Sequence, residues 1–223
     1  MNKRILLLTI TVLSSISALA QDYFYGSVTF KNYASQPAPA QQLYDSIRFS
    51  YFTNGITQSQ YYYSNPTLIF PTEIVELDTT CYIQYKDKPN VLLQDKRIDG
   101  NTFSVRATNE YLDILGYRCQ KFVVERKIDS SYTMITYHWL AQTLKLATDK
   151  YRNKLLNQVP LKHERIKLYK NGKVAYVDIR EAVSIKRDDL AFDLNQLVRG
   201  KSIQPNSYNA IKQEFKIGDK VNF

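Results

Sequence analysis

Apolar and polar residues alternate over short stretches along most of this chain. Between residues 46 and 52 the apolar side chains Ile47, Phe49 and Tyr51 are separated by polar residues. Successive side chains of an extended strand point to opposite faces, so a period of two indicates one buried face and one solvated face. The pattern therefore predicts a β-strand whose apolar side faces a core.

The same period recurs further along the chain. Phe103, Val105 and Ala107 alternate with polar residues, and apolar positions also alternate over residues 164–170 and 173–186. Through residue 185 the second of these ranges keeps its apolar positions on one parity. Abundant tyrosine and β-branched residues, together with few glycines, support strands over helices.

Turn sequences separate these stretches. Asn171-Gly172 favours a two-residue type I′ turn, which joins adjacent antiparallel strands. Further turns are predicted at residues 87–90, 99–101 and 129–130, and Gly116 stands where a side chain would strain the backbone. Additional strands are accordingly expected over residues 91–97, 102–108, 118–127 and 131–141.

Helical periodicity is weak and limited to two short stretches, residues 148–156 and 188–197. The predicted fold class is therefore mainly β: a curved antiparallel sheet or half-open β-barrel with one or two short helices. A sheet of that many strands must curl or close to protect its edges.

The N-terminus has the features of a secretory signal peptide. Lys3 and Arg4 precede a short apolar run, and Ala18-Leu19-Ala20 offers a small-residue cleavage site. The alternative, a membrane anchor, is disfavoured because the apolar run is too short to span a bilayer. We therefore expect residues 1–20 to be removed and the protein to be periplasmic or secreted, and not membrane-spanning.

The rest of the chain forms one predicted β domain, residues 21–200, followed by a C-terminal tail, residues 201–223. Loss of Lys3 and Arg4 lowers the formal charge from +9 to +7. Such a charge could favour anionic partners. The basic residues are spread along the chain among acidic ones, however, so a solvated surface is the better interpretation, and export argues against nucleic acid.

Several short motifs in order resemble a known group of proteins. Residues 114–122 read I-L-G-Y-R-C-Q-K-F, which is similar to the "I-x-G-Y-x-C-x-K" core of the GLPGLI family and its relatives. These are exported Gram-negative proteins of unknown function. Residues 137–141 resemble the tryptophan-containing strand of that group. Residues 159–161 resemble its Pro-Leu element, and residues 189–192 resemble its "D-x-x-F" end.

The resemblance covers residues 46–194, and the chain lacks the Gly-Leu-Pro-Gly-Leu-Ile string, so a sibling family is the closer match. It implies a curved antiparallel sheet similar to that of the periplasmic lipoprotein carriers, with a concave apolar face. It carries over no catalytic residue, because the group has no settled activity.

The two cysteines, Cys81 and Cys119, are predicted to pair. An oxidising compartment favours a bridge over a metal site or a catalytic thiol, and the bridge would stabilise the fold by roughly 4 kcal/mol. The alternative is two separate buried thiols.

No catalytic or metal-binding constellation is visible. The two histidines, His138 and His163, lie in or beside predicted strands, and each is interpreted as a strand residue. Nucleophile, phosphate-loop, dinucleotide and zinc motifs are absent. We therefore predict no enzyme activity, no cofactor and no metal.

Two functions are compatible with these observations. The first is a non-enzymatic carrier that holds an apolar or lipid-like ligand on the concave face of the sheet. Its candidate contact residues are Ile47, Phe49, Tyr51, Phe103, Val105 and Trp139. Trp139 could instead anchor a filled core. The second function is an envelope structural or protein-interaction module with such a core, which docks protein through a face or an edge of the sheet.

Overall fold

A computed structural model describes residues 23–33, 45–63, 71–77, 80–85, 90–95, 103–127, 130–147, 156–195, 199 and 201–205. Several sequence predictions lie outside these ranges. They are the signal peptide, the turn at 87–90 apart from residue 90, the turn at 99–101, the helix at 148–156 apart from residue 156 and the part of the 201–223 tail after residue 205.

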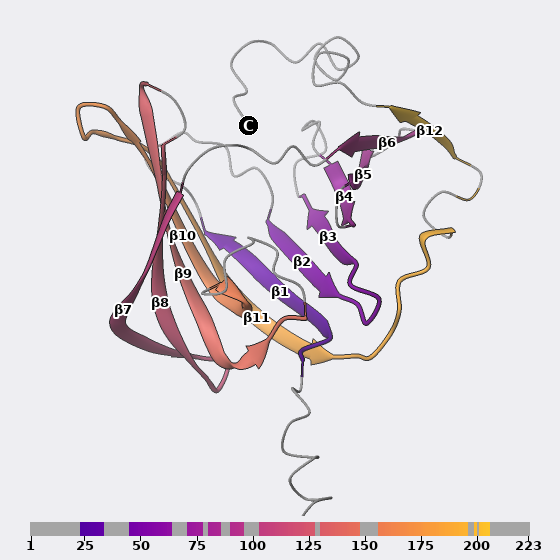
Figure 1. Cartoon of the computed structure of the whole chain (residues 1–223), viewed down its shortest axis with the longest axis horizontal. Coiled ribbons are helices and arrows are strands. Elements are labelled where there is room, and N and C mark those ends of the chain that lie inside the picture. The colour runs from indigo at the N-terminus through magenta and orange to yellow at the C-terminus, as the bar shows by residue number, and fades with distance from the viewer. Residues whose placement is uncertain are drawn as a thin grey trace, which may run out of the picture.

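The described chain forms twelve strands of one sheet (Figure 1). They are β1 (Gly26–Tyr33), β2 (Ser46–Tyr51), β3 (Thr57–Tyr62), β4 (Pro71–Glu76), β5 (Thr80–Tyr85), β6 (Asn90–Asp95), β7 (Phe103–Ile114), β8 (Tyr117–Lys127), β9 (Tyr132–Lys145), β10 (Gln158–Tyr169), β11 (Val174–Arg187) and β12 (Ser202–Pro205).

Two meanders meet in the middle of this sheet, whose strand order is β12-β6-β5-β4-β3-β2-β1-β11-β10-β9-β8-β7. All neighbours are antiparallel except β12, which pairs with β6 in parallel. Figure 1 shows β7–β10 and β1–β6 as two arms of a bent sheet. The sheet is open and is not closed into a barrel. The predicted mainly β fold with a curved antiparallel sheet is therefore confirmed.

No helical element of even one full turn is present in the described ranges. The structure describes residues 188–195 of the predicted helix at 188–197, and of these Leu194 and Asn195 are helical while residues 188–193 are extended or irregular. Phe192 packs its ring 5.1 Å from that of Phe52, and the Asn54 side-chain amide donates a 2.9 Å hydrogen bond to the Phe192 carbonyl. These contacts hold the segment against the β2–β3 turn.

The β7–β8 turn confirms the prediction for Gly116. Ile114 and Tyr117 are paired, so Leu115 and Gly116 form a two-residue turn. Their φ angles are 51° and 81° respectively, as a type I′ turn requires. Glycine adopts a positive φ without a steric cost, whereas for Leu115 the same conformation is strained.

The turn at Asn171-Gly172 does join adjacent antiparallel strands, but its predicted type is wrong. Only Gly172 has a positive φ, 79°. The Tyr169 N–H donates to the Lys173 carbonyl, and the Gly172 N–H donates to the Tyr169 carbonyl, both at 2.9 Å. The loop therefore has three residues, 170–172, with a type I turn followed by a left-handed glycine.

A β-bulge overturns the uniform parity predicted for β11. Thr29 of β1 is opposite Ser184 and Phe30 is opposite Ala182, so Val183 has no direct partner. An extra residue in one strand reverses the facing of everything beyond it. As a result Ala182 and Ile185 both contact the core, while Val183 is 48% exposed.

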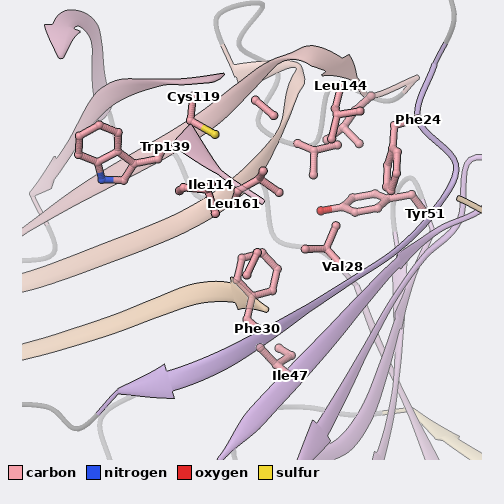
Figure 2. Packing of buried hydrophobic residues seen from close by; sticks show 14 residues of the cluster. Phe24, Val28, Phe30, Ile47, Tyr51, Ile114, Cys119, Trp139, Leu144 and Leu161 are labelled. Carbon is pink, nitrogen blue, oxygen red and sulfur yellow. The ribbon is translucent and has the colours of Figure 1, made fainter. Parts of the chain in front are cut away.

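The main core packs at one end of the bent sheet (Figure 2). Its buried members are Phe24, Val28, Phe30, Ile47, Tyr51, Ile114, Cys119, Trp139, Ala141, Leu144, Leu146, Val159, Leu161 and Ala182. We call this the lower end, because it includes the β7–β8 turn at the lower left of Figure 1, and the opposite end, with the β10–β11 turn, the upper end.

The predicted disulfide is wrong. Cys81 on β5 and Cys119 on β8 are both free thiols, the first half-buried and the second buried. Their strands lie in different arms of the sheet, and a bridge needs Cα atoms within about 7 Å. Compartment and cysteine count favour pairing, but neither carries information about this distance.

Candidate ligand-binding face

One face of the sheet carries Phe30, and we call it the inner face. Phe30 is opposite Ile47 of β2 and Ala182 of β11, and directly opposed residues of antiparallel strands share a face. The rings of Phe30 and of His163 on β10 lie 5.6 Å apart, although β11 lies between their strands. Strands two places apart are separated by about 10 Å, so these side chains lean together on the side towards which the sheet curves.

The inner face of β7–β11 changes from apolar to charged across the strands. Pairing places Val105 beside Val124 and Val124 beside Thr136. Thr136 is opposite Arg165, which is opposite Asp178. One row of side chains therefore has its apolar part on β7 and β8 and its charged part on β10 and β11.

A second row lies nearer the upper end. It consists of Phe103, Arg126, Met134 and Lys167 from four neighbouring strands. Phe103 is 40% exposed and the other three are half-buried. The Lys167 Nζ lies 4.0 Å from the centroid of the Tyr132 ring, a cation–π distance. This end of the inner face is therefore accessible, aromatic and basic.

A third row lies nearer the core and is largely buried. It consists of Phe122, His138, His163, Arg180 and Asn32. The imidazole rings of His138 and His163 are 4.8 Å apart with an interplanar angle of 76°. The two histidines do lie in strands, as their sequence context predicts, and their side chains contact each other.

An ion pair lies next to these histidines. Arg180 donates from Nη2 and Nε to Oδ2 of Asp178, at 3.0 and 3.2 Å, and both side chains are nearly buried. Burial, and then the positive charges of Arg165 and Arg180, lower the pKa of His138 from its ordinary value to about 4. His138 is therefore neutral at pH 7.

Arg165 and Lys167 differ from Arg180 because no carboxylate holds them. Among the described residues neither side chain forms a hydrogen bond or an ion pair, and both residues are half-buried on the inner face of β10. On the outer face of the same region, the Lys162 Nζ lies 3.1 Å from Oε1 of Glu164 and 3.5 Å from Oε2 of Glu181, as two ion pairs. Glu164 and Glu181 therefore lie on the other side of the sheet, and the inner-face carboxylate opposite Arg165, Asp178, is paired with Arg180.

The β2 residues that the sequence predicted as ligand contacts lie against the protein's own core. Ile47 is 0% exposed, Tyr51 is 9% exposed and the half-buried Phe49 packs on the same cluster. The Phe49 ring lies 5.5 Å from that of Phe30, and the Tyr51 ring lies 5.9 Å from that of Phe24. All three therefore contact other core side chains, and Figure 2 shows Ile47 and Tyr51 among them.

Trp139 belongs to the same cluster but approaches it from the other face of β9. It is opposite Lys121 and Lys162, and the Lys121 Nζ lies 5.5 Å from its ring centroid. The register of β9 and β10 shifts twice between Gln158 and Lys162, which changes the side chains that share a face near the lower end. Trp139 therefore reaches the core at the left of Figure 2.

The remaining two candidates, Val105 and Phe103, lie on the inner face of the other arm. Val105 packs against a separate cluster of Phe122, Leu140 and Leu156. The structure thus keeps these two apart from the β2 residues. Sequence reasoning did not single out Arg165 and Lys167, although their period of two with His163 was visible.

A hollow of about 440 Å³ lies on the outer face at the upper end. Its lining includes Glu125, Lys127, Ile135 and Lys170, with serine, threonine and tyrosine around them. Charges of both signs and mixed polarity select no single class of ligand.

Two further observations concern membrane and metal chemistry. In the part of the chain that the structure covers, no helix combines the length and the apolar composition needed to cross a membrane. Within the same residues, no three histidine, cysteine, aspartate or glutamate side chains gather closely enough to hold a metal ion.

Fold and site together define a mainly β protein with one open antiparallel sheet and a partly apolar, partly basic inner face. No protein-family model matches the chain, and no curated protein matches it. The solved structures that are similar to the chain include the following three. Two are crystal structures of PNGF-II, in the C2 and P21 space groups, at 18% and 19% identity with TM-scores of 0.48 and 0.49.

These two matches cover 85% and 86% of this chain but only 32% and 33% of PNGF-II, so the chain spans about a third of that protein's length. The third is an uncharacterized conserved protein from Thermus thermophilus, which is 11% identical and has a TM-score of 0.47. This match covers 89% of this chain and 99% of that protein. With TM-scores below 0.5, none of the three supports a functional argument. The resemblance to GLPGLI-like proteins stays a prediction.

Proposed function

We propose that this is an exported, non-enzymatic binding or carrier protein that holds an apolar or lipid-like ligand on the inner face of its open sheet. The supporting observation is the uneven filling of that face. Buried side chains pack closely at the lower end, whereas Phe103, Val105, Val124 and Met134 at the upper end lie outside the main cluster and are exposed or half-buried.

The mechanism is burial of apolar surface. Each Å² removed from water contributes about 25 cal/mol, so a ligand that covers about 200 Å² of apolar area gains on the order of 5 kcal/mol. Such binding needs few polar contacts and tolerates variation in chain length. Of the predicted contact residues, Phe103 and Val105 are the accessible ones, whereas the β2 residues and Trp139 pack in the protein's own core.

The test is mass spectrometry of organic extracts from the purified full-length protein. We expect a copurified apolar molecule in near-stoichiometric amount. Val105→Asn should weaken its retention by roughly fivefold, because a half-buried apolar contact is lost. Arg106→Asn is the matched control, since this neighbour is exposed on the outer face of the same strand. Extracts without any apolar ligand would contradict the proposal.

A protein-interaction role is the second candidate, and strand β7 favours it. In the described sheet β7 is an edge with one neighbour, β8, and it exposes Phe103, Tyr111 and Leu112. An edge strand of twelve residues offers unpaired backbone groups to an extended partner segment. Cross-linking in the envelope separates the two functions: a stoichiometric protein partner and no extracted lipid favours this one.

A further inference from the structure

Two cations on one strand are spaced to contact the same anion. Arg165 and Lys167 are two positions apart on β10 and project from the inner face. Their Cα atoms are about 7 Å apart along the strand. A single carboxylate, sulfate or phosphate between the two side chains can accept hydrogen bonds from both.

The surrounding charges leave these two cations available. Asp178, the inner-face carboxylate nearest to Arg165 in the strand register, already accepts both contacts from Arg180. Arg126 adds a further positive charge to the row of Lys167. Among the described inner-face residues of β7–β11, cations therefore outnumber carboxylates, and the electrostatic complement of this surface is an anion.

The apolar part of the same surface begins directly beside the cations. Thr136 and Met134 on β9 separate them from Val124 on β8 and from Val105 and Phe103 on β7. Three strand spacings, about 14 Å, lead from β10 to β7. A molecule with an anionic group at one end and an alkyl chain of about that length matches both parts at once.

We infer that the ligand of the inner face is an anionic amphiphile, with its acidic head group between Arg165 and Lys167 and its alkyl chain across β9 and β8 towards Val105 and Phe103. This inference rests on the proposed carrier function and adds the chemical class of the ligand and its orientation. The head-group contacts are charge-assisted hydrogen bonds on a half-buried surface, where they exceed neutral ones in strength.

The experiment compares three twelve-carbon probes that differ only in head group: dodecanoate, dodecanol and dodecyltrimethylammonium. Each displaces a neutral apolar fluorophore, N-phenyl-1-naphthylamine, from the full-length protein at low ionic strength. We expect dodecanoate to bind about tenfold more tightly than dodecanol, and the cationic probe to bind most weakly.

The variant Arg165→Gln/Lys167→Gln should bind dodecanoate and dodecanol within about twofold of each other, with the dodecanol affinity unchanged. Arg106→Gln/Lys173→Gln removes the same charge from exposed residues outside the inner face and should keep the tenfold preference. If the first double variant does not fold, Lys167→Gln alone should reduce the preference to roughly threefold.

The outcomes distinguish the inference from the function on which it depends. Equal binding of dodecanoate and dodecanol by the unaltered protein would overturn the head-group inference and leave the carrier function intact. A preference that survives the loss of Arg165 and Lys167 would overturn the assignment of these residues. Failure of all three probes to bind would overturn the carrier function as well.

Discussion

The imidazole rings of His138 and His163 lie 4.8 Å apart across neighbouring strands of the sheet. Arg180 follows His163 in the same row, and the next row contains Arg165 and Asp178. The histidine pair thus separates the close-packed core from the accessible upper part of the inner face. A third positive charge at His138 would lie next to two guanidinium groups and out of contact with water.

The stability of the protein should therefore depend on the neutral state of His138. Unfolded, this side chain titrates near its ordinary pKa of 6.5, whereas in the fold burial, then Arg165 and Arg180, lower the pKa to about 4. Between these values the unfolded state binds a proton that the folded state does not. The free energy of unfolding should fall as the pH drops through this window, by up to roughly 3 kcal/mol.

Urea denaturation at several pH values between 7.5 and 4 measures this dependence. His138→Gln is the control, because it keeps a polar side chain that does not titrate. The variant should lose less stability than the unaltered protein between pH 6.5 and 4. Identical pH slopes for the two proteins would show that His138 is not the group responsible.

Gly26 should tolerate no side chain. Its φ is 131°, and a Cβ atom there would lie 2.1 Å from the carbonyl oxygen of Lys186 on the neighbouring strand. Gly26→Ala should lower the free energy of unfolding by about 3 kcal/mol or more, because β1 and β11 join the two meanders. Gly172→Ala, at φ 79° with nothing within 4 Å, should cost only about 1 kcal/mol. Thermal unfolding compares the stabilities of the two variants. Equal losses of stability would exclude the contact between the new Cβ atom and the Lys186 carbonyl oxygen as the cause.

Leu115 offers a stabilising substitution. It is an exposed, non-glycine residue with φ 51° at the first position of the β7–β8 turn. Asparagine adopts this conformation more readily, so Leu115→Asn should raise the free energy of unfolding by about 0.5–1 kcal/mol. Leu115→Val should lower it, since β-branched residues resist positive φ. Chemical denaturation measures both variants. A Leu115→Val protein more stable than the Leu115→Asn protein would show that the backbone at Leu115 is not strained.

The thiol of Cys119 should be unreactive in the folded protein. Burial, then the negative charge of Asp113, raises its pKa to about 11, against a weaker lowering by the backbone hydrogen bond of Ile114. At pH 8 the thiolate fraction is about a hundredfold below that of an ordinary cysteine. A chromogenic disulfide reagent should therefore modify Cys119 only on unfolding. The intact mass should correspond to a protein with two free thiols. A mass two units lower would show that Cys81 and Cys119 form the predicted disulfide after all.

Strands were the most predictable part of this protein, because one-sided burial imposes a period of two on local sequence. The alternation around Ile47 and around Val105 marks strands in the structure. Local backbone chemistry also marked Gly116 as a position where a side chain would strain the backbone, and its φ of 81° confirms this. The predictions failed where one residue changes the register: the bulge at Val183 and the three-residue loop at Gly172 depend on how the partner strand is placed.

The candidate site was less predictable, for a related reason. Each strand of the inner face shows by itself which of its residues share a side, but not which strand is adjacent. The sequence alone determined a mainly β chain with alternating faces and the position of the turn at Asn171-Gly172. Tertiary structure alone decided that β1 pairs with β11, that Cys81 and Cys119 lie in different arms, and that Arg165 and Lys167 lie beside an apolar surface. Such neighbours are distant along the chain, and only the strand pairing of the complete sheet brings them together.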